Sequence, residues 1–247
     1  MRLTVVGSGD AFGSGGRLMT CFLVDTDAGC VMLDCGPTAT IGLERVGRNP
    51  NGIETVVISH LHGDHFAGLV WLYIHALYAG HRRTPLAVYG PPGIEARFKA
   101  AAEILYPDCT KVELKFALSF HEIHAGIPAK AGPLGVFAYE VEHPSGAPSY
   151  ALRLTSGAKV LAFTGDTRWV EALIPCGQGA DLYIMECYTF DKPTYYHLGW
   201  VEIAANLNRL GAKGVLLTHM SNDMLARRGE IRDPRAIVAE DGQIIDV

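Results

Sequence analysis

Three histidines and one aspartate fall within six positions of one short segment, Ser59-His60-Leu61-His62-Gly63-Asp64-His65-Phe66. Neutral imidazole and carboxylate oxygen are the ligands that Zn²⁺, Mn²⁺ and iron accept. The alternate spacing of His60 and His62 lets both side chains converge on one ion. Asp64 and His65, at the start of the next predicted helix, can point at a second, and Gly63 allows a backbone turn that a residue with a Cβ would resist. The segment predicts a metal site rather than a solvent-exposed loop.

Further polar residues each stand at or just after the end of a predicted strand: His143, Asp166, Glu186 and His219. Singly, each is a weak signal, because a histidine after a strand is usually a hydrogen-bonded surface residue and Gly-Asp is a common turn. Strand ends, however, are where a rigid scaffold holds reactive side chains along one edge. We therefore expect these residues to lie beside the histidine-rich segment.

The elements that must position these residues are short β-rich runs and amphipathic stretches. Runs of Val, Ile, Phe and Tyr that end in Gly, Pro, Asp or Asn predict strands at Leu3–Val6, Cys21–Asp25, Val31–Asp34, Thr55–Ile58, Leu86–Tyr89, Val112–Phe116, Val136–Val141, Tyr150–Thr155, Val160–Phe163, Leu182–Glu186 and Gly214–Thr218. Helices are predicted at Thr38–Val46, Phe66–Ala79, Gly93–Ala102, Trp169–Leu173 and Gly199–Leu210. Strands in runs with helices between them favour sheets packed on each other and covered outside by helices, in one α/β domain over residues 1–247.

Composition narrows the class of protein. The net charge is −5 and Lys and Arg form no run, so a dedicated nucleic-acid groove is disfavoured and a small-molecule substrate is favoured. No apolar run is long enough to cross a bilayer, and the N-terminus shows no secretory pattern. The six cysteines contain no C-x-x-C pair, which favours buried thiols over disulfides. A soluble, cytoplasmic protein is expected.

The order His-x-His-x-Asp-His, then His143, Asp166 and His219, resembles the motif order of the metallo-β-lactamase superfamily from Met1 to Met220. The resemblance implies an αββα sandwich, with two mixed sheets, helices on the outer faces, and two divalent metal ions at one edge. It implies that one ion is held by His60, His62 and His143 and the other by Asp64, His65 and His219, with Asp166 bridging. Zinc is favoured by the histidine-rich set, and manganese or iron also fits.

Within the superfamily the chain is similar to the tRNA 3′-processing endonucleases (tRNase Z). The similarity rests on the glycine-rich segment that ends at Arg17, on Thr218-His219-Met220-Ser221, and on Met185-Glu186-Cys187-Tyr188-Thr189-Phe190 followed by Tyr195-Tyr196-His197. It implies that His197, oriented by Glu186, assists the leaving group. The alternative is a surface histidine that caps the helix Leu198–Leu210.

The interval from Pro144 to Gly165 is filled by two predicted strands, where tRNase Z enzymes carry a tRNA-gripping arm. An armless cyclic phosphodiesterase of phosphonate breakdown is the nearer functional resemblance. We therefore expect hydrolysis of a small or cyclic phosphodiester by a metal-bridging hydroxide, with Asp64 as the acceptor of its proton. The alternatives are a tRNase Z-type ribonuclease and, on the same site, a lactonase or other carboxylic-ester hydrolase in which Tyr195 or Tyr196 stabilises an oxyanion.

Readings outside hydrolysis have less support. His62 argues against a di-iron redox protein, because flavin-linked members of that kind usually carry Glu at this position. The complete ligand set argues against a binding module whose metal site has been lost. His121 and His124 are expected at the surface or beside the site, and His75 and His81 in structural roles. The segment Gly7–Gly16 is expected to be a tight turn rather than an anion cradle. Aromatic residues in Trp71–Tyr78, if exposed, permit a homodimer.

Overall fold

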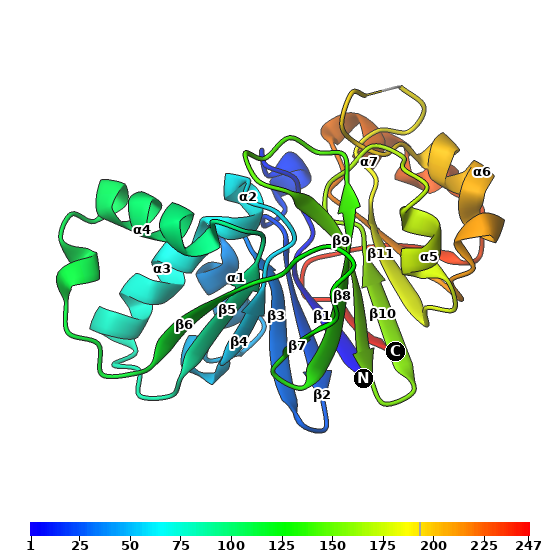
Figure 1. The fold of residues 1–247 in the computed structure, drawn as a ribbon. Coiled ribbons are helices and arrows are strands. Elements are labelled where there is room, and N and C mark those ends of the chain that lie inside the picture. The colour runs from blue at the N-terminus through cyan, green and yellow to red at the C-terminus, as the bar shows by residue number, and fades with distance from the viewer. Residues whose placement is uncertain (193) are drawn as a thin grey trace.

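The computed structural model describes residues 1–192 and 194–247. Two seven-stranded sheets lie face to face, with helices on both outer sides (Figure 1). In the first sheet the strand order is β14 (Ile244–Asp246), β1 (Arg2–Gly7), β2 (Cys21–Thr26), β3 (Gly29–Cys35), β4 (Thr55–Val57), β5 (Leu86–Gly90) and β6 (Leu118–Glu122). Strands β14 to β3 pair antiparallel, and β3 to β6 pair parallel, so the sheet is mixed.

The second sheet repeats this plan. Its order is β13 (Ala236–Val238), β12 (Val215–Thr218), β11 (Leu182–Glu186), β10 (Lys159–Phe163), β9 (Ser149–Ser156), β8 (Leu134–Val141) and β7 (Ala129–Ala131). Strands β10 to β13 pair parallel, and β7 to β10 pair antiparallel. The parallel strands β10, β11 and β12 therefore end at the same edge of the sheet, as do β3, β4 and β5 in the first.

Helices cover the outer face of each sheet. On the first sheet lie α1 (Ala39–Arg45), α2 (Gly63–Phe66), α3 (Gly68–Ile74) with the π-helical turn η3 (His75–Ala79), and α4 (Ile94–Leu105). On the second lie α5 (Leu173–Gly177), α6 (Trp200–Leu210) and α7 (Asn222–Arg227). The 3₁₀ turns are η1 (Ser14–Gly16), η2 (Pro50–Gly52), η4 (Cys109–Lys111) and η5 (Arg228–Glu230).

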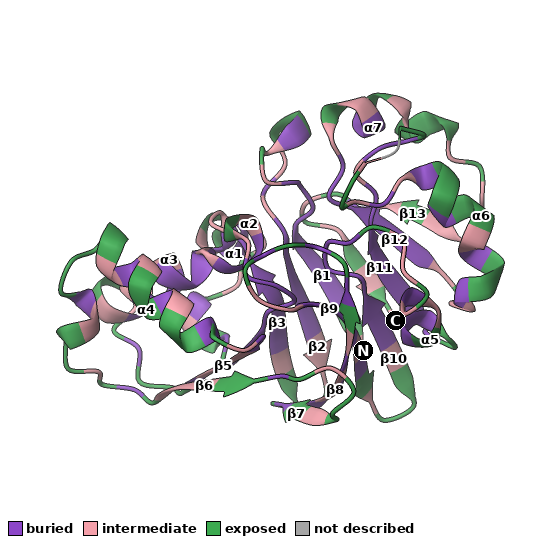
Figure 2. Ribbon diagram, turned by 45° about the horizontal axis from the view of Figure 1, so that its top comes forward, coloured by how far each residue is buried: buried purple, intermediate pink, exposed green. Residues whose placement is uncertain are grey.

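Alternation along the strands divides the core into three layers. Phe22 and Leu33 face the other sheet, while their neighbours Leu23 and Met32 face the helices. The inter-sheet layer is fully buried at its centre, and Figure 2 shows the strands as the purple interior of the molecule. Side chains of successive strand residues point to opposite faces, so both faces of each sheet are apolar where both are covered.

Most predicted strands are confirmed, and the strand at Val112–Phe116 is wrong. The chain there forms η4 and a loop, and β6 follows at Leu118–Glu122, in parallel register with β5. Val112 is 37% exposed, and Phe116 packs 5.7 Å from the guanidinium of the buried Arg82. The apolar residues of this run therefore serve loop packing instead of sheet pairing, which a local pattern does not distinguish.

The predicted helices need two corrections. Trp169–Leu173 is wrong, because the helix α5 starts only at Leu173. Phe66–Ala79 is divided into α2, α3 and η3, with an irregular junction at Ala67. Gly68, at the start of α3, lies so close to β3 that a Cβ there would stand 2.0 Å from the carbonyl oxygen of Gly36. Glycine is required at this position by close backbone approach.

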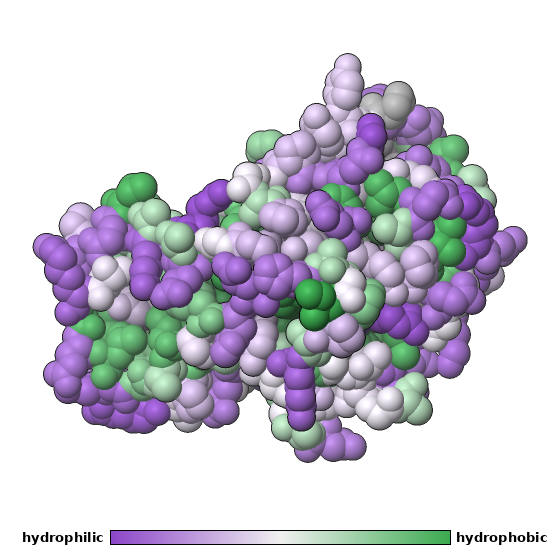
Figure 3. All heavy atoms as spheres, in the orientation of Figure 1, coloured by the Kyte–Doolittle hydropathy of each residue, from purple (hydrophilic) through white to green (hydrophobic). Residues whose placement is uncertain are grey.

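The cysteines, the absence of a membrane span and the exposure of aromatic residues were predicted from composition and can be compared with the structure. All six cysteines are free and five are buried, as predicted. No helix in the described ranges is long and apolar enough to span a membrane. In Trp71–Tyr78 the aromatic residues are only partly exposed: Tyr73 is buried and Tyr78 is 59% exposed. Figure 3 shows apolar side chains gathered on the lobe that carries α3 and α4. A homodimer and a cytoplasmic location stay predictions.

Candidate metal centre

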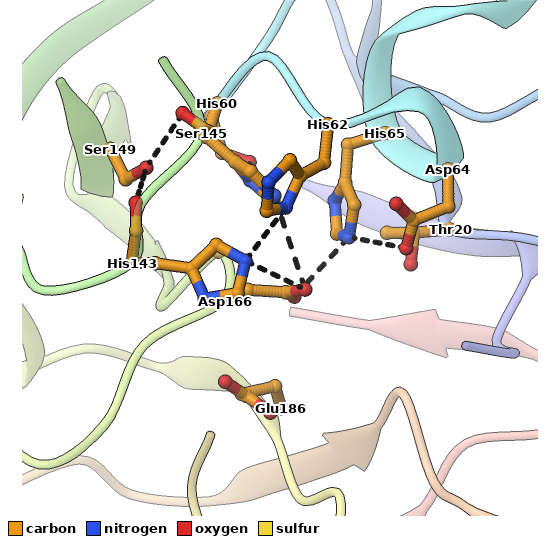
Figure 4. A network of polar contacts seen from close by, with 12 residues as sticks. Thr20, His60, His62, Asp64, His65, His143, Ser145, Ser149, Asp166 and Glu186 are labelled. Atoms are coloured by element: carbon orange, nitrogen blue, oxygen red, sulfur yellow. Dashed lines mark hydrogen bonds and ion pairs between the residues drawn. The ribbon is translucent and has the colours of Figure 1, made fainter. Parts of the chain in front are cut away.

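The predicted ligands come from both sheets and meet at one edge of the sandwich. The first sheet supplies His60 and His62 after β4, and Asp64 and His65 in the first turn of α2. The second supplies His143, Asp166 and His219 from the segments after β8, β10 and β12. Figure 4 shows the rings of His62, His65 and His143 turned towards the carboxylate of Asp166. Strands of opposite sheets therefore bring together residues up to 159 positions apart in sequence, from His60 to His219.

Among the groups of potential ligand atoms in the described residues, two divide the seven predicted ligands between them. In one, His60, His62 and His143 each offer an atom within 4.8 Å of the others. In the other, Asp64, His65, Asp166 and His219 do the same. These are the two groups that the motif order implied, with Asp166 joined to the second.

Asp166 lies between the two groups. Its Oδ2 is 3.9 Å from Nε2 of His60 and 3.8 Å from Nε2 of His143, in the first group. The same oxygen is 3.3 Å from Nε2 of His219, and Oδ1 is 3.2 Å from Nε2 of His65, in the second. One carboxylate therefore faces both sets of imidazoles, which is the position of a bridging ligand.

Several of these polar atoms are buried and lack a hydrogen bond, although they lie close to one another. Nε2 of His60, Nε2 of His65 and Oδ1 of Asp166 are shielded from solvent and make no hydrogen bond. Leaving buried polar atoms unpaired costs free energy, and nitrogen and carboxylate donors around a shared point suit a divalent cation. The residues present therefore fit divalent metal ions.

The pKa shifts of the residues in the centre also indicate a site for cations. Burial lowers the pKa of His143 to about 4, so its imidazole is neutral, as a ligand must be. At His65 burial also opposes the charged form, but the carboxylates of Asp166, Asp64 and Asp34 together raise its pKa well above the usual range. The second group thus attracts positive charge strongly, which a metal ion would supply in place of protons.

Local backbone geometry supports the ligands at particular points. Gly165 has φ +58°, and a Cβ there would lie 2.8 Å from the carbonyl oxygen of Tyr150, so the turn before Asp166 requires glycine. The expectation that Gly63 is similarly required is wrong, because it begins α2 with open space where a Cβ would stand. His219 itself adopts φ +56°, and its N–H donates to the carbonyl of Ser8 at 3.0 Å.

Asp34 is a functional residue that the sequence reasoning missed. This fully buried carboxylate lies 2.6 Å from Nδ1 of His65 and accepts hydrogen bonds from the N–H and the hydroxyl of Ser59, both at 2.7 Å. The contact orients the His65 ring so that Nε2 faces Asp166. Its signal in the sequence was an aspartate at the end of an apolar strand, the same signal that singled out Asp166.

Replacing Asp34 by Asn is expected to weaken metal binding by roughly 10- to 100-fold, because a carboxylate partner raises the basicity of a histidine ligand and holds its orientation. Chelator competition on the purified protein measures this affinity. Asp34→Ala is expected to lower Tm as well, since the φ of +55° is unfavourable for alanine by about 1–2 kcal/mol. Asp27→Asn, an exposed residue in the turn between β2 and β3, is the control. An unchanged affinity in Asp34→Asn would refute the orienting role.

The half-buried His197 and the fully buried Glu186 form a pair beside the ligands. Nδ1 of His197 is 3.0 Å from Oε2 and 3.2 Å from Oε1 of Glu186, whose Oε1 also accepts the N–H of Thr167 at 2.6 Å. A nitrogen of His197 lies within 4.8 Å of ligand atoms of His143 and Asp166. His197 does not cap α6, because the N-cap is Gly199. Burial opposes the imidazolium, but Glu186 overcomes this effect and the pKa of His197 is raised to about 9.

A cavity of about 510 Å³ opens over the metal centre, and we name it the central cavity. Its floor contains His62, Asp64 and Asp166, and its walls include Tyr188 and the segment Thr194–His197. Phe12 and Tyr195, which also line it, are 80% and 88% exposed. The cavity is large enough for a small organic ester bound next to the predicted ligands.

The glycine-rich segment is a turn rather than an anion cradle, as expected. The carboxylate of Asp10 accepts the N–H groups of Phe12 and Ser14 at 3.2 and 2.9 Å, and the hydroxyl of Ser14 at 2.7 Å. Backbone donors that could have bound an anion are thus used within the turn. Its role is to place Ala11 and Phe12 in the wall of the central cavity.

The remaining histidines lie outside the metal centre. His121 and His124 are exposed, and the His121 ring stacks on Tyr89 with centroids 4.6 Å apart, so their placement at the surface is confirmed. His75 is half-buried within η3, and His81 is exposed. None of these four belongs to a group of potential metal ligands among the described residues.

Comparison with known proteins agrees with this geometry. A family model described as "Anti-Pycsar protein Apyc1" matches residues 1–244. Ribonuclease Z of Haloferax volcanii is 25% identical over an alignment of 308 positions that covers 100% of this chain and 95% of the relative. The probable metallo-hydrolase YhfI of Bacillus subtilis is 26% identical over 89% of this chain and 87% of its own length.

Solved structures show the same fold. The metallo-β-lactamase fold protein YhfI from Bacillus subtilis has a TM-score of 0.79 at 22% identity and covers 99% of both chains. Human tRNase Z, short form, has a TM-score of 0.77 at 23% identity, covering 100% of this chain and 99% of that one. The metallo-β-lactamase sandwich predicted from the motif order is confirmed, and the named relatives are hydrolases that use this fold.

Proposed function

This chain belongs to the Anti-Pycsar protein Apyc1 family within the metallo-β-lactamase fold, and we propose that it is a dinuclear-metal phosphodiesterase acting on a small or cyclic phosphodiester. The observation that carries the proposal is the His197–Glu186 pair, 3.0 Å apart, directly beside the ligands His143 and Asp166. A proton donor next to a metal centre suits cleavage of a phosphorus–oxygen bond whose departing alkoxide needs a proton.

The ligand assignment is part of the proposal. His60, His62 and His143 would hold one ion, Asp64, His65 and His219 the other, and Asp166 would contact both. When bound, two divalent cations, with zinc favoured, would activate water at neutral pH and neutralise charge on the phosphoryl oxygens. Both sheets supply ligands, so the proposal requires the single domain over residues 1–247 predicted from the sequence.

The chain's own residues would then handle protons on opposite sides of the phosphorus. His65 and His219 hold the pKa of Asp64 below its usual range despite burial, so this carboxylate is ionised and fit to be a ligand. Acceptance of the nucleophile's proton by Asp64 is part of the proposal. His197, with its raised pKa, carries a proton at neutral pH and can deliver it to the departing oxygen. Glu186 fixes the ring by accepting the Nδ1 hydrogen, which leaves Nε2 to act on the substrate.

A tRNase Z-type ribonuclease is the second candidate, favoured by the curated relatives that bear that name. Against it, β9 and β10 fill the interval between His143 and Asp166, with no long insertion between them. The Haloferax alignment spans 308 positions against 247 residues here, so that relative carries residues without a counterpart in this chain. These observations favour a small phosphodiester over tRNA.

The test is hydrolysis of bis(p-nitrophenyl) phosphate by zinc- or manganese-loaded protein, beside a lactone panel and a 3′-extended tRNA. We expect turnover of the phosphodiester, complete loss after chelation, and recovery when the metal is restored. Cleavage of lactones alone would replace the proposal with a carboxylic-ester hydrolase that uses the same centre. Cleavage of tRNA at a rate far above the small diester would favour the ribonuclease.

A further inference from the structure

A second cavity lies against the central one, and we name it the side groove. It has a volume of about 540 Å³ and lies between the segment after Asp166, the segment after β11 and the first two turns of α6. Thr194 and His197 line both cavities. The wall between the metal centre and the side groove is therefore formed by the very residue proposed to protonate the leaving group.

The position of His197 indicates that the side groove would hold the leaving group of the reaction. One ring nitrogen is held by Glu186, and the residue reaches to within 4.8 Å of ligand atoms of His143 and Asp166. The departing oxygen must approach the free nitrogen of His197 to receive a proton. Whatever carbon skeleton carries that oxygen then needs space next to His197. The side groove offers this space on the far side of the central cavity.

Most charged side chains of the side groove have an ion-pair partner, and one carboxyl group does not. The cations of the groove are all paired: Arg168 with Glu142, Lys192 with Asp223 at 2.9 Å, and His197 with Glu186 at 3.0 Å. Of its two carboxylates, Asp191 is paired with Arg227 at 2.7 Å, whereas Glu202, in the first turn of α6, has no ion-pair partner within the described ranges of the chain. Partial burial raises the pKa of Glu202. The groove therefore has no spare cation for a second phosphate, but it has a carboxyl group free to accept hydrogen bonds from a ligand.

The indole of Trp169 adds an apolar face to the side groove. The guanidinium of Arg209 already lies 5.9 Å from the centre of this ring, and Arg209 is held 2.5 Å from Glu171. A cationic ligand on the ring would meet a like charge, whereas the C–H face of a sugar or polyol would not. An indole face with a carboxylate acceptor nearby suits a neutral molecule that has several hydroxyl groups.

We propose that the side groove is the leaving-group subsite and that it takes a neutral alcohol with several hydroxyl groups, a sugar or a polyol, bound at Trp169 and Glu202. This inference rests on the proposed phosphodiesterase function. In the reaction, water adds to phosphorus, the bond from phosphorus to the alcohol oxygen breaks, and His197 gives its proton to that oxygen. The products are a phosphomonoester and the free polyol, which departs through the groove.

Three methyl phosphodiesters that differ only in the second alcohol test the subsite: glyceryl, ethyl and choline methyl phosphate. We measure kcat and KM for release of methyl phosphate by the metal-loaded protein. The wild type is expected to favour the glyceryl ester at least tenfold in kcat/KM over the other two. Trp169→Ala and Glu202→Gln are expected to remove this preference, mainly through KM, while activity on the ethyl ester, which has no hydroxyl groups to bind, stays within twofold.

Controls separate the causes of failure. Glu95→Gln replaces a glutamate that, like Glu202, lies in the first turn of a helix, here α4, and is expected to change nothing. Trp169→Phe, which keeps an aromatic face, is expected to retain most of the preference, and Tm reports folding of each variant. Turnover of bis(p-nitrophenyl) phosphate without any glyceryl preference, or with one that both variants keep, overturns the subsite alone. A preference for choline overturns the neutral alcohol. No turnover of any diester overturns the phosphodiesterase and the subsite together.

Discussion

Asp166→Asn is expected to lower kcat/KM for the phosphodiester by about 10³-fold or more. Among the described residues, Asp166 is the one whose carboxylate oxygens lie within 4 Å of imidazoles from both ligand groups. An amide keeps the size of the side chain but loses the charge that holds two cations together. Charge stabilisation by metal ions contributes several kcal/mol to such a reaction, and each 1.36 kcal/mol is tenfold in rate.

Metal analysis of the same variant distinguishes loss of an ion from loss of a chemical step. We expect about two metal ions per chain in the wild type and one or fewer in Asp166→Asn, measured by inductively coupled plasma mass spectrometry after dialysis. Asp246→Asn, at an exposed position of β14, should keep both ions and full activity. A variant at Asp166 that retained two ions and near-normal turnover would show that this carboxylate does not bridge the centre.

His197→Ala is expected to reduce kcat for alkyl phosphodiesters by about 10²- to 10⁴-fold, the usual contribution of a general acid. The loss should be smaller for p-nitrophenyl esters, because p-nitrophenolate departs readily without a proton. Comparing the two substrate types therefore tests protonation of the leaving group and not merely the integrity of the cavity. Equal losses on both types would assign His197 to binding or structure instead.

The pH dependence of the wild type follows from the same residue. In the proposed mechanism His197 donates a proton, so the active form is the protonated one, and kcat/KM should fall as pH rises through its pKa, about 9. Glu186 is the main cause that raises this pKa. In Glu186→Gln the alkaline limb should therefore move to lower pH, with little change at acidic pH. Glu140→Gln, on the exposed side of β8, serves as the control. An alkaline limb that does not move in Glu186→Gln would contradict the assignment.

The structural neighbours add a useful contrast. Human tRNase Z, short form, shares the sandwich with a TM-score of 0.77 at 23% identity. The fold by itself thus says little about substrate, which depends on the side chains and segments around the centre. In this chain the centre is surrounded by the compact β9–β10 connection, the exposed Phe12 and Tyr195 at the central cavity, and the side groove beyond His197.

Much of the site was predictable because its signals are local. The residue types and spacing of the segment from His60 to His65 indicate a metal site. His143, Asp166 and His219 each follow an apolar strand of recognisable pattern. Parallel strands place their ends at one edge of a sheet, so residues at those ends meet without any knowledge of packing. The two-layer architecture followed from the same runs of strands and helices.

The short edge strands could not be predicted from the local sequence pattern. β7, β13 and β14 have three residues each and were not predicted, because their conformation comes from pairing with β8, β12 and β1. Conversely, Val112–Phe116 has the composition of a strand and forms none, since β5 pairs with Leu118–Glu122 instead. Strand propensity describes fitness for a pleated surface, and the neighbour that offers the surface is a matter of tertiary structure.

The sequence by itself thus determined the ligand types, their order and the class of fold, because each depends on patterns of residues a few positions apart. Only the tertiary structure decided that Asp34 supports His65 across 31 positions, that His197 turns inward to Glu186 instead of capping α6, and that a groove opens behind it. Those outcomes depend on which surfaces pack against each other, and packing energies couple residues that are distant along the chain.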